Sequence, residues 1–264
     1  MKNNDKISII HPTAIIHPSA QLGEGVQIGA FAVIEENVLI GRECQIHAHA
    51  IIRRNTQMGQ GNIIHSFAVI GGTPQVRGDE DLEGSLIIGN NNAFHEYCTV
   101  NRGYTKLTGM TILGHENILM TSSHVGHDCR LNDRITLVNG VCLAGSVLVD
   151  TGANLSANCL VHQFCRIGRL SFVSANSLIT MDLLPFFLYS NHLGKPKSMG
   201  LNSKGLKRAK MTDQDLSLLK NLYKQLIRKR AGSSEYDNLM ASLPSCYIEE
   251  VFEFIKKSQR GWYR

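Results

Sequence analysis

Aliphatic residues recur at every sixth position through most of the first 180 residues, and no other feature of the chain constrains its fold as strongly. A six-residue period matches neither the 3.6-residue repeat of an α-helix nor the two-residue repeat of a strand. It is the spacing of a parallel β-helix, in which each hexad forms a short strand and a turn, and three hexads close one triangular coil. The repeating positions are Ile10, Ile16, Leu22, Ile28, Ile34, Ile40, Ile46, Ile52, Met58, Ile64, Ile70, Ile88, Phe94, Val100, Leu113, Leu119, Val125, Leu131, Leu137, Leu143, Val149, Leu155, Val161, Ile167, Val173 and Ile179.

A mostly small residue follows each aliphatic four positions later, and both are expected to point into the coil. With 43% hydrophobic but only 6% aromatic residues, the composition suits such aliphatic stacking. Glycine often comes directly after the aliphatic, where we expect it to relieve a turn of positive φ. Most cysteines fall on the small inward positions and none form a Cys-x-x-Cys pair, which predicts free thiols in a reducing compartment.

The repeat ends near Pro185, and the sequence beyond it has a helical pattern. Thr212 fits an N-cap with Asp215 three residues later, and apolar residues then mark one helix face. Further helices are expected over 234–243 and 248–259. We predict a mainly β chain with the following parts: a hexapeptide-repeat β-helix over 1–190, loops near 72–85 and 103–111 where the register is lost, and a C-terminal α-helical domain over 191–264.

Charge and apolar runs narrow the class of protein. The net charge is +5, and basic residues gather late in the chain, where a phosphate-bearing ligand fits; we predict no nucleic-acid partner. The first residues are polar and no apolar run is long enough to span a membrane, so a cytoplasmic protein without a transmembrane segment is expected. The basic positions are Lys195, Lys197, Lys204, Lys207, Arg208 and Lys210.

Residues eighteen positions apart lie above one another in such a coil, separated by roughly 4.8 Å. This spacing puts His127, Gly145 and Gln163 in one column, with Asp128 and Ser146 in the next column. A histidine, a carboxylate, a glycine backbone and an amide therefore converge on one edge of the prism.

This column has the parts of an acyl-transfer site. His127 is a candidate general base, and Asp128 can fix its tautomer. Gly145 can offer its N–H to a developing oxyanion. His124 and His162 lie close to the column and are further candidates.

Three segments, His124-Val-Gly-His127-Asp128-Cys, His162-Gln163-Phe164-Cys165 and Gly205-Leu206-Lys207-Arg208, resemble the UDP-N-acetylglucosamine O-acyltransferases of lipid A biosynthesis. The resemblance covers essentially the whole chain. It implies a homotrimer of left-handed β-helices with active sites between subunits. It also implies acyl carrier protein as donor, through its phosphopantetheine, the sugar 3-hydroxyl of the UDP-sugar as acceptor, and neither cofactor nor metal.

The resemblance assigns roles residue by residue. His127 matches the general base, Asp128 the acid that orients it, and Gly145 the donor to the oxyanion. The remaining matches are Gln75 in the substrate loop, His124 near the sugar, His162 and Gln163 near the acyl and pantetheine groups, Asn202 and Arg208 in the nucleotide-binding segment, and Ala175 at a position that limits acyl-chain length.

Several positions depart from the family pattern. Val76-Arg77-Gly78 stands where an Asp and a Lys commonly follow the loop glutamine. Asn101 and Ser146 replace common histidines, Ser146 at a substrate-contacting position, and Ala209 replaces a second arginine. The catalytic pair is retained, so the departures bear on the substrate rather than on the reaction class.

Three alternatives fit the same repeat. One is an N-acyltransferase on a UDP-amino or diamino sugar; relatives for the later lipid A step carry an extra N-terminal domain, whereas these hexads begin at Ile10. Another is a zinc hydratase, for which His124, His127 and His162 are the candidate ligands. The third is a pseudoenzyme or structural β-helix.

Overall fold

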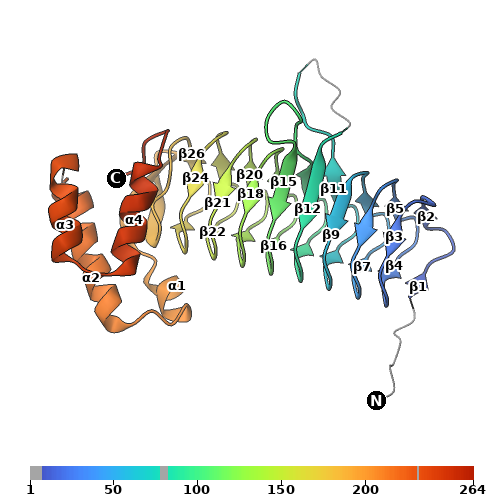
Figure 1. Cartoon of the computed structure of the whole chain (residues 1–264), viewed down its shortest axis with the longest axis horizontal. Coiled ribbons are helices and arrows are strands. Elements are labelled where there is room, and N and C mark those ends of the chain that lie inside the picture. The colour runs from blue at the N-terminus through green and yellow to red at the C-terminus, as the bar shows by residue number, and fades with distance from the viewer. Residues whose placement is uncertain (1–7, 78–82, 231) are drawn as a thin grey trace.

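Short parallel strands stack into a prism with three faces, and helices pack at its C-terminal end (Figure 1). The computed structural model describes residues 8–77, 83–230 and 232–264. Each face is one sheet, labelled A, B or C, and the chain visits the three faces in turn before starting the next coil.

The strands are mostly two residues long. Sheet A contains β1 (Ile9–Ile10), β4 (Gln27–Ile28), β7 (Gln45–Ile46), β10 (Ile63–Ile64), β13 (Ala93–Phe94), β16 (Ile118–Leu119), β19 (Thr136–Leu137), β22 (Asn154–Leu155), β25 (Phe172–Val173), β27 (Phe187–His192) and β28 (Lys195–Leu201). Sheet B contains β2 (Ile15–Ile16), β5 (Val33–Ile34), β8 (Ile51–Ile52), β11 (Val69–Gly72), β14 (Thr99–Asn101), β17 (His124–Val125), β20 (Cys142–Leu143), β23 (Leu160–Val161) and β26 (Leu178–Ile179). Sheet C contains β3 (Gln21–Leu22), β6 (Leu39–Ile40), β9 (Thr56–Met58), β12 (Ser85–Ile88), β15 (Met110–Leu113), β18 (Arg130–Leu131), β21 (Leu148–Val149) and β24 (Arg166–Ile167).

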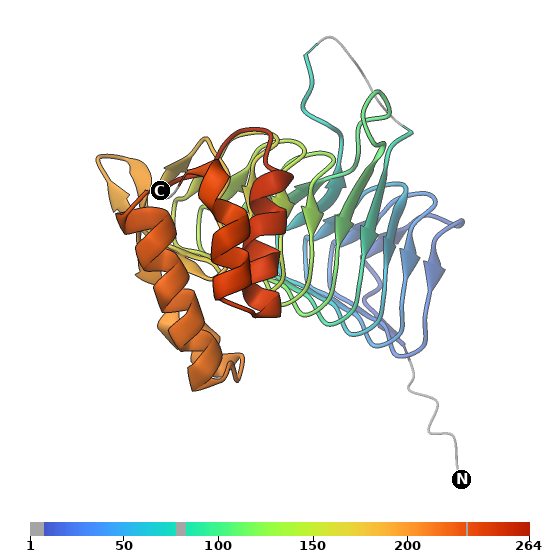
Figure 2. The same ribbon diagram turned by 60° about the vertical axis from the view of Figure 1, so that its left-hand side comes forward.

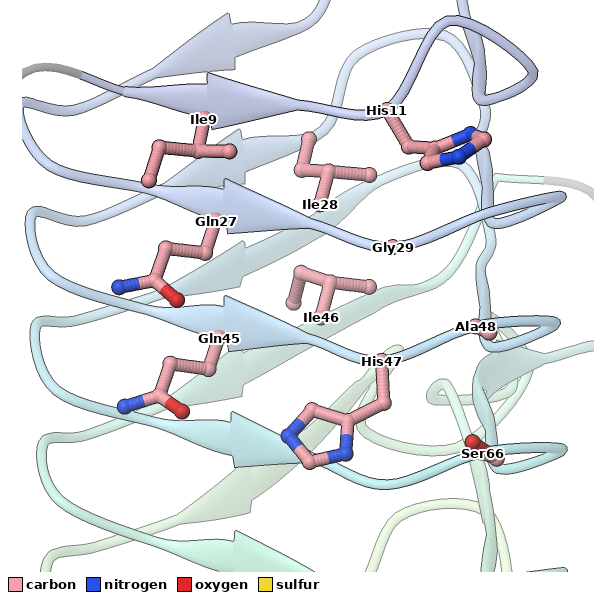
Figure 3. Close-up of a pocket in the computed structure, with 10 residues that line it drawn as sticks. All are labelled: Ile9, His11, Gln27, Ile28, Gly29, Gln45, Ile46, His47, Ala48 and Ser66. Carbon is pink, nitrogen blue, oxygen red and sulfur yellow. The ribbon is translucent and has the colours of Figure 1, made fainter.

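The eighteen-residue register expected from the hexads is confirmed. In sheet B, His124 pairs in parallel with Cys142. At the first coils, Ile9, Gln27 and Gln45 lie in one outward-facing column on sheet A (Figure 3). Because each coil repeats the same path, a residue's column can be counted from its position in the sequence.

The inward positions form the core as expected. The repeating aliphatics from Ile28 to Ile179 are at most 3% exposed. Five of the cysteines, at 44, 98, 129, 159 and 165, are buried free thiols. Burial raises the pKa of the Cys98 and Cys129 thiols to about 12, so both stay protonated near neutral pH.

Most glycines that follow the aliphatics act through their size, which corrects the expectation that they supply positive φ; Gly71, with a φ of 85°, fits that expectation. A Cβ on Gly41 would lie 2.5 Å from the carbonyl carbon of Gly59 in the next coil. Positive φ falls two residues further on in each turn and often on residues other than glycine, such as Glu43 and Asn37. At Gly41 the adjacent coil is therefore too close for a side chain.

Both expected loops leave the prism at the same edge (Figures 1 and 2). One follows β11 and rejoins at β12; its residues 78–82, which include Gly78, lie outside the described part of the chain. The other occupies residues 102–109, between β14 and β15. Neither loop breaks the pairing, because Ile70 still pairs with Val100 and Val100 with Val125.

The C-terminal part begins with the β27–β28 hairpin, which the sequence did not predict. β27 spans the boundary predicted between residues 190 and 191, so the division into two domains stays a prediction. Helices follow, and Glu250 of α4 (Cys246–Lys256) forms an ion pair with Arg169 of the last coil, with a shortest N–O distance of 2.6 Å. The predicted cap is confirmed, since Thr212 Oγ1 accepts a 3.1 Å hydrogen bond from the Asp215 N–H. The helical segments are α1 (Ser203–Arg208), α2 (Asp213–Tyr223), a π-helical turn (Lys224–Arg228), a 3₁₀ turn (Ser233–Glu235), α3 (Tyr236–Ser242) and α4 (Cys246–Lys256).

Among the described residues, no helix has both the length and the apolar character needed to cross a bilayer.

The close approach of the coils makes a stability prediction. Gly41→Ala should lower the free energy of unfolding by about 1–3 kcal/mol, because its Cβ must push the neighbouring backbone away. Gly232→Ala is the matched control, since a Cβ there meets nothing closer than 3.9 Å. Urea unfolding of the two variants measures the difference, and equal midpoints would contradict the prediction.

Candidate active site

A groove of about 500 Å³ runs along sheet B and the turn that leaves it. It brings together most of the predicted site residues, which come from three successive coils and the first loop. The site residues that line it are Gln75, His124, His127, Gly145, His162 and Gln163. Asn101, one of the positions that departs from the family pattern, lines it as well.

His127 and Asp128 form a hydrogen-bonded pair at the edge of this groove. The distance from His127 Nδ1 to Asp128 Oδ2 is 2.7 Å. Because a carboxylate can only accept, Nδ1 carries the shared proton and Nε2 keeps its lone pair. The pair therefore has the arrangement of an oriented general base.

Asp128 is fixed from the side opposite the groove. Its side chain is 0% exposed, and its φ of 59° lies in the left-handed region, which Asp tolerates better than most residues. The N–H groups of Tyr104 and Thr108 donate to the two carboxylate oxygens at 3.1 and 3.0 Å. The Asp128 N–H donates to Thr111 Oγ1 at 2.8 Å. Both ends of the second loop thus hold this residue.

Gly145 lies directly against the imidazole of His127. A Cβ at this position would be 2.6 Å from both Nε2 and Cε1 of the ring. Only glycine leaves room for the ring, and the free Nε2 edge therefore lies over the Gly145 backbone. Within the described part of the chain, no group accepts a hydrogen bond from the Gly145 N–H. A base and an unused amide donor consequently face the same small volume.

His124 lies beside this pair, within β17. Its Nδ1 is 2.8 Å from Thr99 Oγ1 in the coil below. Burial, with a smaller contribution from nearby His127, lowers the pKa of His124. The neutral ring is therefore favoured in the folded protein, and it can exchange a hydrogen bond with a polar ligand in the groove.

Five predicted site residues are not among those lining this groove, and Asp128, which lies behind His127, is one of them. Ser146 faces an adjoining hollow on the other side of the turn, together with Asp128. Asn202 caps α1 and donates to the Leu170 carbonyl at 2.9 Å, so within one chain its side chain has a structural role. Arg208 is exposed at the end of α1, and Ala175 lies in the turn before β26.

The sequence did not reveal the residues that hold the catalytic pair. Tyr104, Thr108 and Thr111 belong to the second loop, and Thr99 belongs to the coil below His124. The hexad pattern carried no signal for them, because the loop has no period and its path is set by packing. The sequence feature that could have identified them is the pair of threonines, Thr108 and Thr111, just before the hexad repeat resumes at Leu113.

Comparisons with known proteins identify the family of this chain. A relative from Xylella fastidiosa is 40% identical over 99% of this chain and 100% of its own length, and one from Anaeromyxobacter dehalogenans is 43% identical over 96% and 98%. Both are named acyl-[acyl-carrier-protein]–UDP-N-acetylglucosamine O-acyltransferase. This chain belongs to the UDP-N-acetylglucosamine O-acyltransferase family. The family model for domain 2 of these enzymes matches residues 182–263, and a model of the GMPPB C-terminal domain matches residues 10–107.

Solved structures of the acyltransferase family confirm the left-handed β-helix. The UDP-N-acetylglucosamine acyltransferase of Francisella novicida superposes with a TM-score of 0.92 at 34% identity, over 97% of this chain and 94% of that one. The enzyme from Bacteroides fragilis gives 0.93 at 34% identity, over 97% and 100%. Membership of an acyltransferase family favours the predicted reaction class over the hydratase and structural alternatives.

Within residues 8–77, 83–230 and 232–264, no three His, Cys, Asp or Glu side chains form a metal-binding group. The three histidines considered for zinc, His124, His127 and His162, all line the groove but do not form such a group within one chain.

Gly145 provides a test of this acyltransferase site. Gly145→Ala should lower kcat about 100-fold or more, because the added Cβ displaces the His127 ring from the position it occupies. The fold should survive, since the clash is with a side chain and not with a neighbouring backbone. Steady-state kinetics and thermal melting measure the two effects, and unchanged kcat would show that the ring does not act from this position.

His124 makes a pH prediction. Its pKa is lowered on folding, so it contributes stability above its unfolded value of about 6.5 that is lost as the pH falls toward the folded value. His124→Gln should therefore reduce the acid-induced loss of the free energy of unfolding between about pH 7 and pH 5. Urea unfolding across this range measures it, and parallel curves for the two proteins would contradict the assignment.

Proposed function

We propose that this protein transfers a fatty acyl group, of the 3-hydroxy type, from acyl carrier protein to the 3-hydroxyl of UDP-N-acetylglucosamine. His127 Nε2 takes the proton of the sugar hydroxyl as its oxygen attacks the thioester carbonyl. Asp128 holds the ring and stabilises its protonated form, while the Gly145 N–H donates to the tetrahedral oxyanion. Collapse of that intermediate expels the pantetheine thiolate, which takes the proton back from His127.

The observation that carries this proposal is the position of the His127 ring. Its Nδ1 side is bonded to a buried carboxylate, and its Nε2 side lies over Gly145. Direct attack needs no covalent enzyme intermediate and no bound cofactor, so these groups suffice for the chemistry. Exposed Leu160 and Leu178 continue the groove beyond Cys142 and offer an apolar path for an acyl chain.

We further propose that the active enzyme is a cytoplasmic homotrimer that catalyses the first step of lipid A synthesis. An exposed ladder of stacked rings on the edge between sheets A and B supports an assembly, since Phe31, Phe67 and Tyr97 are 55, 46 and 58% exposed. His49 completes that stack. A neighbouring chain would also bring a nucleotide-binding segment, including Asn202 and Arg208, to a groove that lacks them.

The choice of acceptor needs a direct test, because Asn101, Ser146 and Val76 differ from the family pattern. Asn101 lines the groove, where its amide can hydrogen-bond a sugar but cannot act as an acid or base near neutral pH. The same base would also serve an amine nucleophile. The test must therefore offer both acceptors.

The decisive assay incubates the purified protein with an acyl carrier protein thioester and either UDP-N-acetylglucosamine or its 3-amino analogue. Mass spectrometry should detect one added acyl ester on the first acceptor. His127→Ala should lower the rate about 10³-fold, because it removes the general base. The exposed His11→Ala is the control. Full activity of His127→Ala would refute the mechanism, and preferential amide formation would favour the N-acyltransferase alternative.

A further inference from the structure

The second loop, residues 102–109, folds back onto the carboxylate of Asp128. The Tyr104 N–H donates to Oδ2, and the Thr108 N–H donates to Oδ1. The Tyr104 ring also meets the His127 imidazole edge to face, with 6.0 Å between ring centroids and 71° between planes. The loop thus restrains both members of the catalytic pair.

Thr108 adds a side-chain donor to these backbone contacts. Its Oγ1 lies 2.5 Å from Asp128 Oδ1 and 3.1 Å from the Met110 carbonyl oxygen. The carboxylate is both the nearer and the charged acceptor, so it takes the hydroxyl proton. Among the described residues, Thr108 and His127 are the side chains that donate to this carboxylate.

The place of Thr108 separates its effect from substrate binding. It lines the adjoining hollow with Ser146 and is not among the residues that line the groove. The Asp128 side chain it contacts is 0% exposed, so solvent is poorly placed to replace a donor that is removed. A change at Thr108 reaches the reaction through Asp128 and His127.

We propose that Thr108 is a positioning residue that sets the orientation and proton affinity of the Asp128–His127 pair. The inference rests on the proposed role of His127 as general base. A carboxylate that accepts from Thr108 has less electron density to offer to His127 Nδ1–H. Removing the hydroxyl leaves the carboxylate freer to rotate and makes it attract the imidazole proton more strongly.

Two consequences distinguish this role from simple structural support. Loss of orientation lowers kcat, while the KM for the sugar nucleotide stays constant because the groove is untouched. Stronger attraction of the proton keeps His127 protonated to higher pH, so the acid limb of the pH–rate profile moves upward. The titratable groups around the pair are Asp128, His124, Tyr104 and His162, with Cys129 next to Asp128. Three cations, Arg130, Arg166 and Lys257, line the adjoining hollow with Asp128, and all of these groups remain in the variant. Arg102, one coil below, directs its guanidinium to the Gly71 carbonyl.

The experiment compares Thr108→Val, which keeps the shape but removes the hydroxyl, with Thr108→Ser, which keeps the hydroxyl. In the full-length enzyme we expect Thr108→Val to lower kcat about 10-fold and to shift the acid limb, with KM unchanged. Thr108→Ser should restore both kcat and the profile. Thr136→Val, on β19 in sheet A, is the matched control and should behave as the unmodified protein.

Several outcomes would overturn the proposal. The first is an unchanged kcat and pH–rate profile in Thr108→Val. The second is an equal loss of kcat in Thr108→Ser. The third is a fall in activity that a lower melting temperature explains entirely. His127→Ala is assayed in parallel. If His127→Ala is fully active, the proposed function fails; if it is inactive while Thr108→Val is normal, only the positioning role fails.

Discussion

The close parallel stacking of coils is the constraint on which the rest of this structure depends. Each strand bonds to the strand one coil away, and the backbones approach so nearly that Gly41 has no room for a Cβ. This packing locks the register, because a slip by one residue would turn the aliphatic core outward. The register in turn places His127 under Gly145, although eighteen residues separate them in the chain.

The catalytic pair is stabilised by an excursion from that regular stack. Asp128 has a left-handed backbone and a buried carboxylate, both of which cost free energy without partners. The loop between β14 and β15 supplies the partners through Tyr104 and Thr108. The regular coils thus bring the reacting groups together, and the irregular segment fixes their orientation.

Much of this arrangement was predictable from the sequence. The hexads gave the coils, the inward residues and the column of His127, Gly145 and Gln163. The reason offered for most of the glycines was wrong, because a tight contact with the neighbouring coil, and not the turn conformation, favours glycine there; Gly71 has the expected positive φ. Ser146 was expected among the substrate contacts, and that role stays a prediction; within one chain it lines the adjoining hollow with Asp128.

By itself, the sequence determined the repeat, the register and the residues that share a column, because a fixed number of residues per coil converts sequence distance directly into spatial distance. It also showed where that conversion stops, at the two loops and after Pro185. Only the tertiary structure decided which donors reach Asp128, which side of the turn each polar residue faces, and how β27, β28 and the helices close the prism. Those segments have no period, so their paths depend on packing against the finished coils.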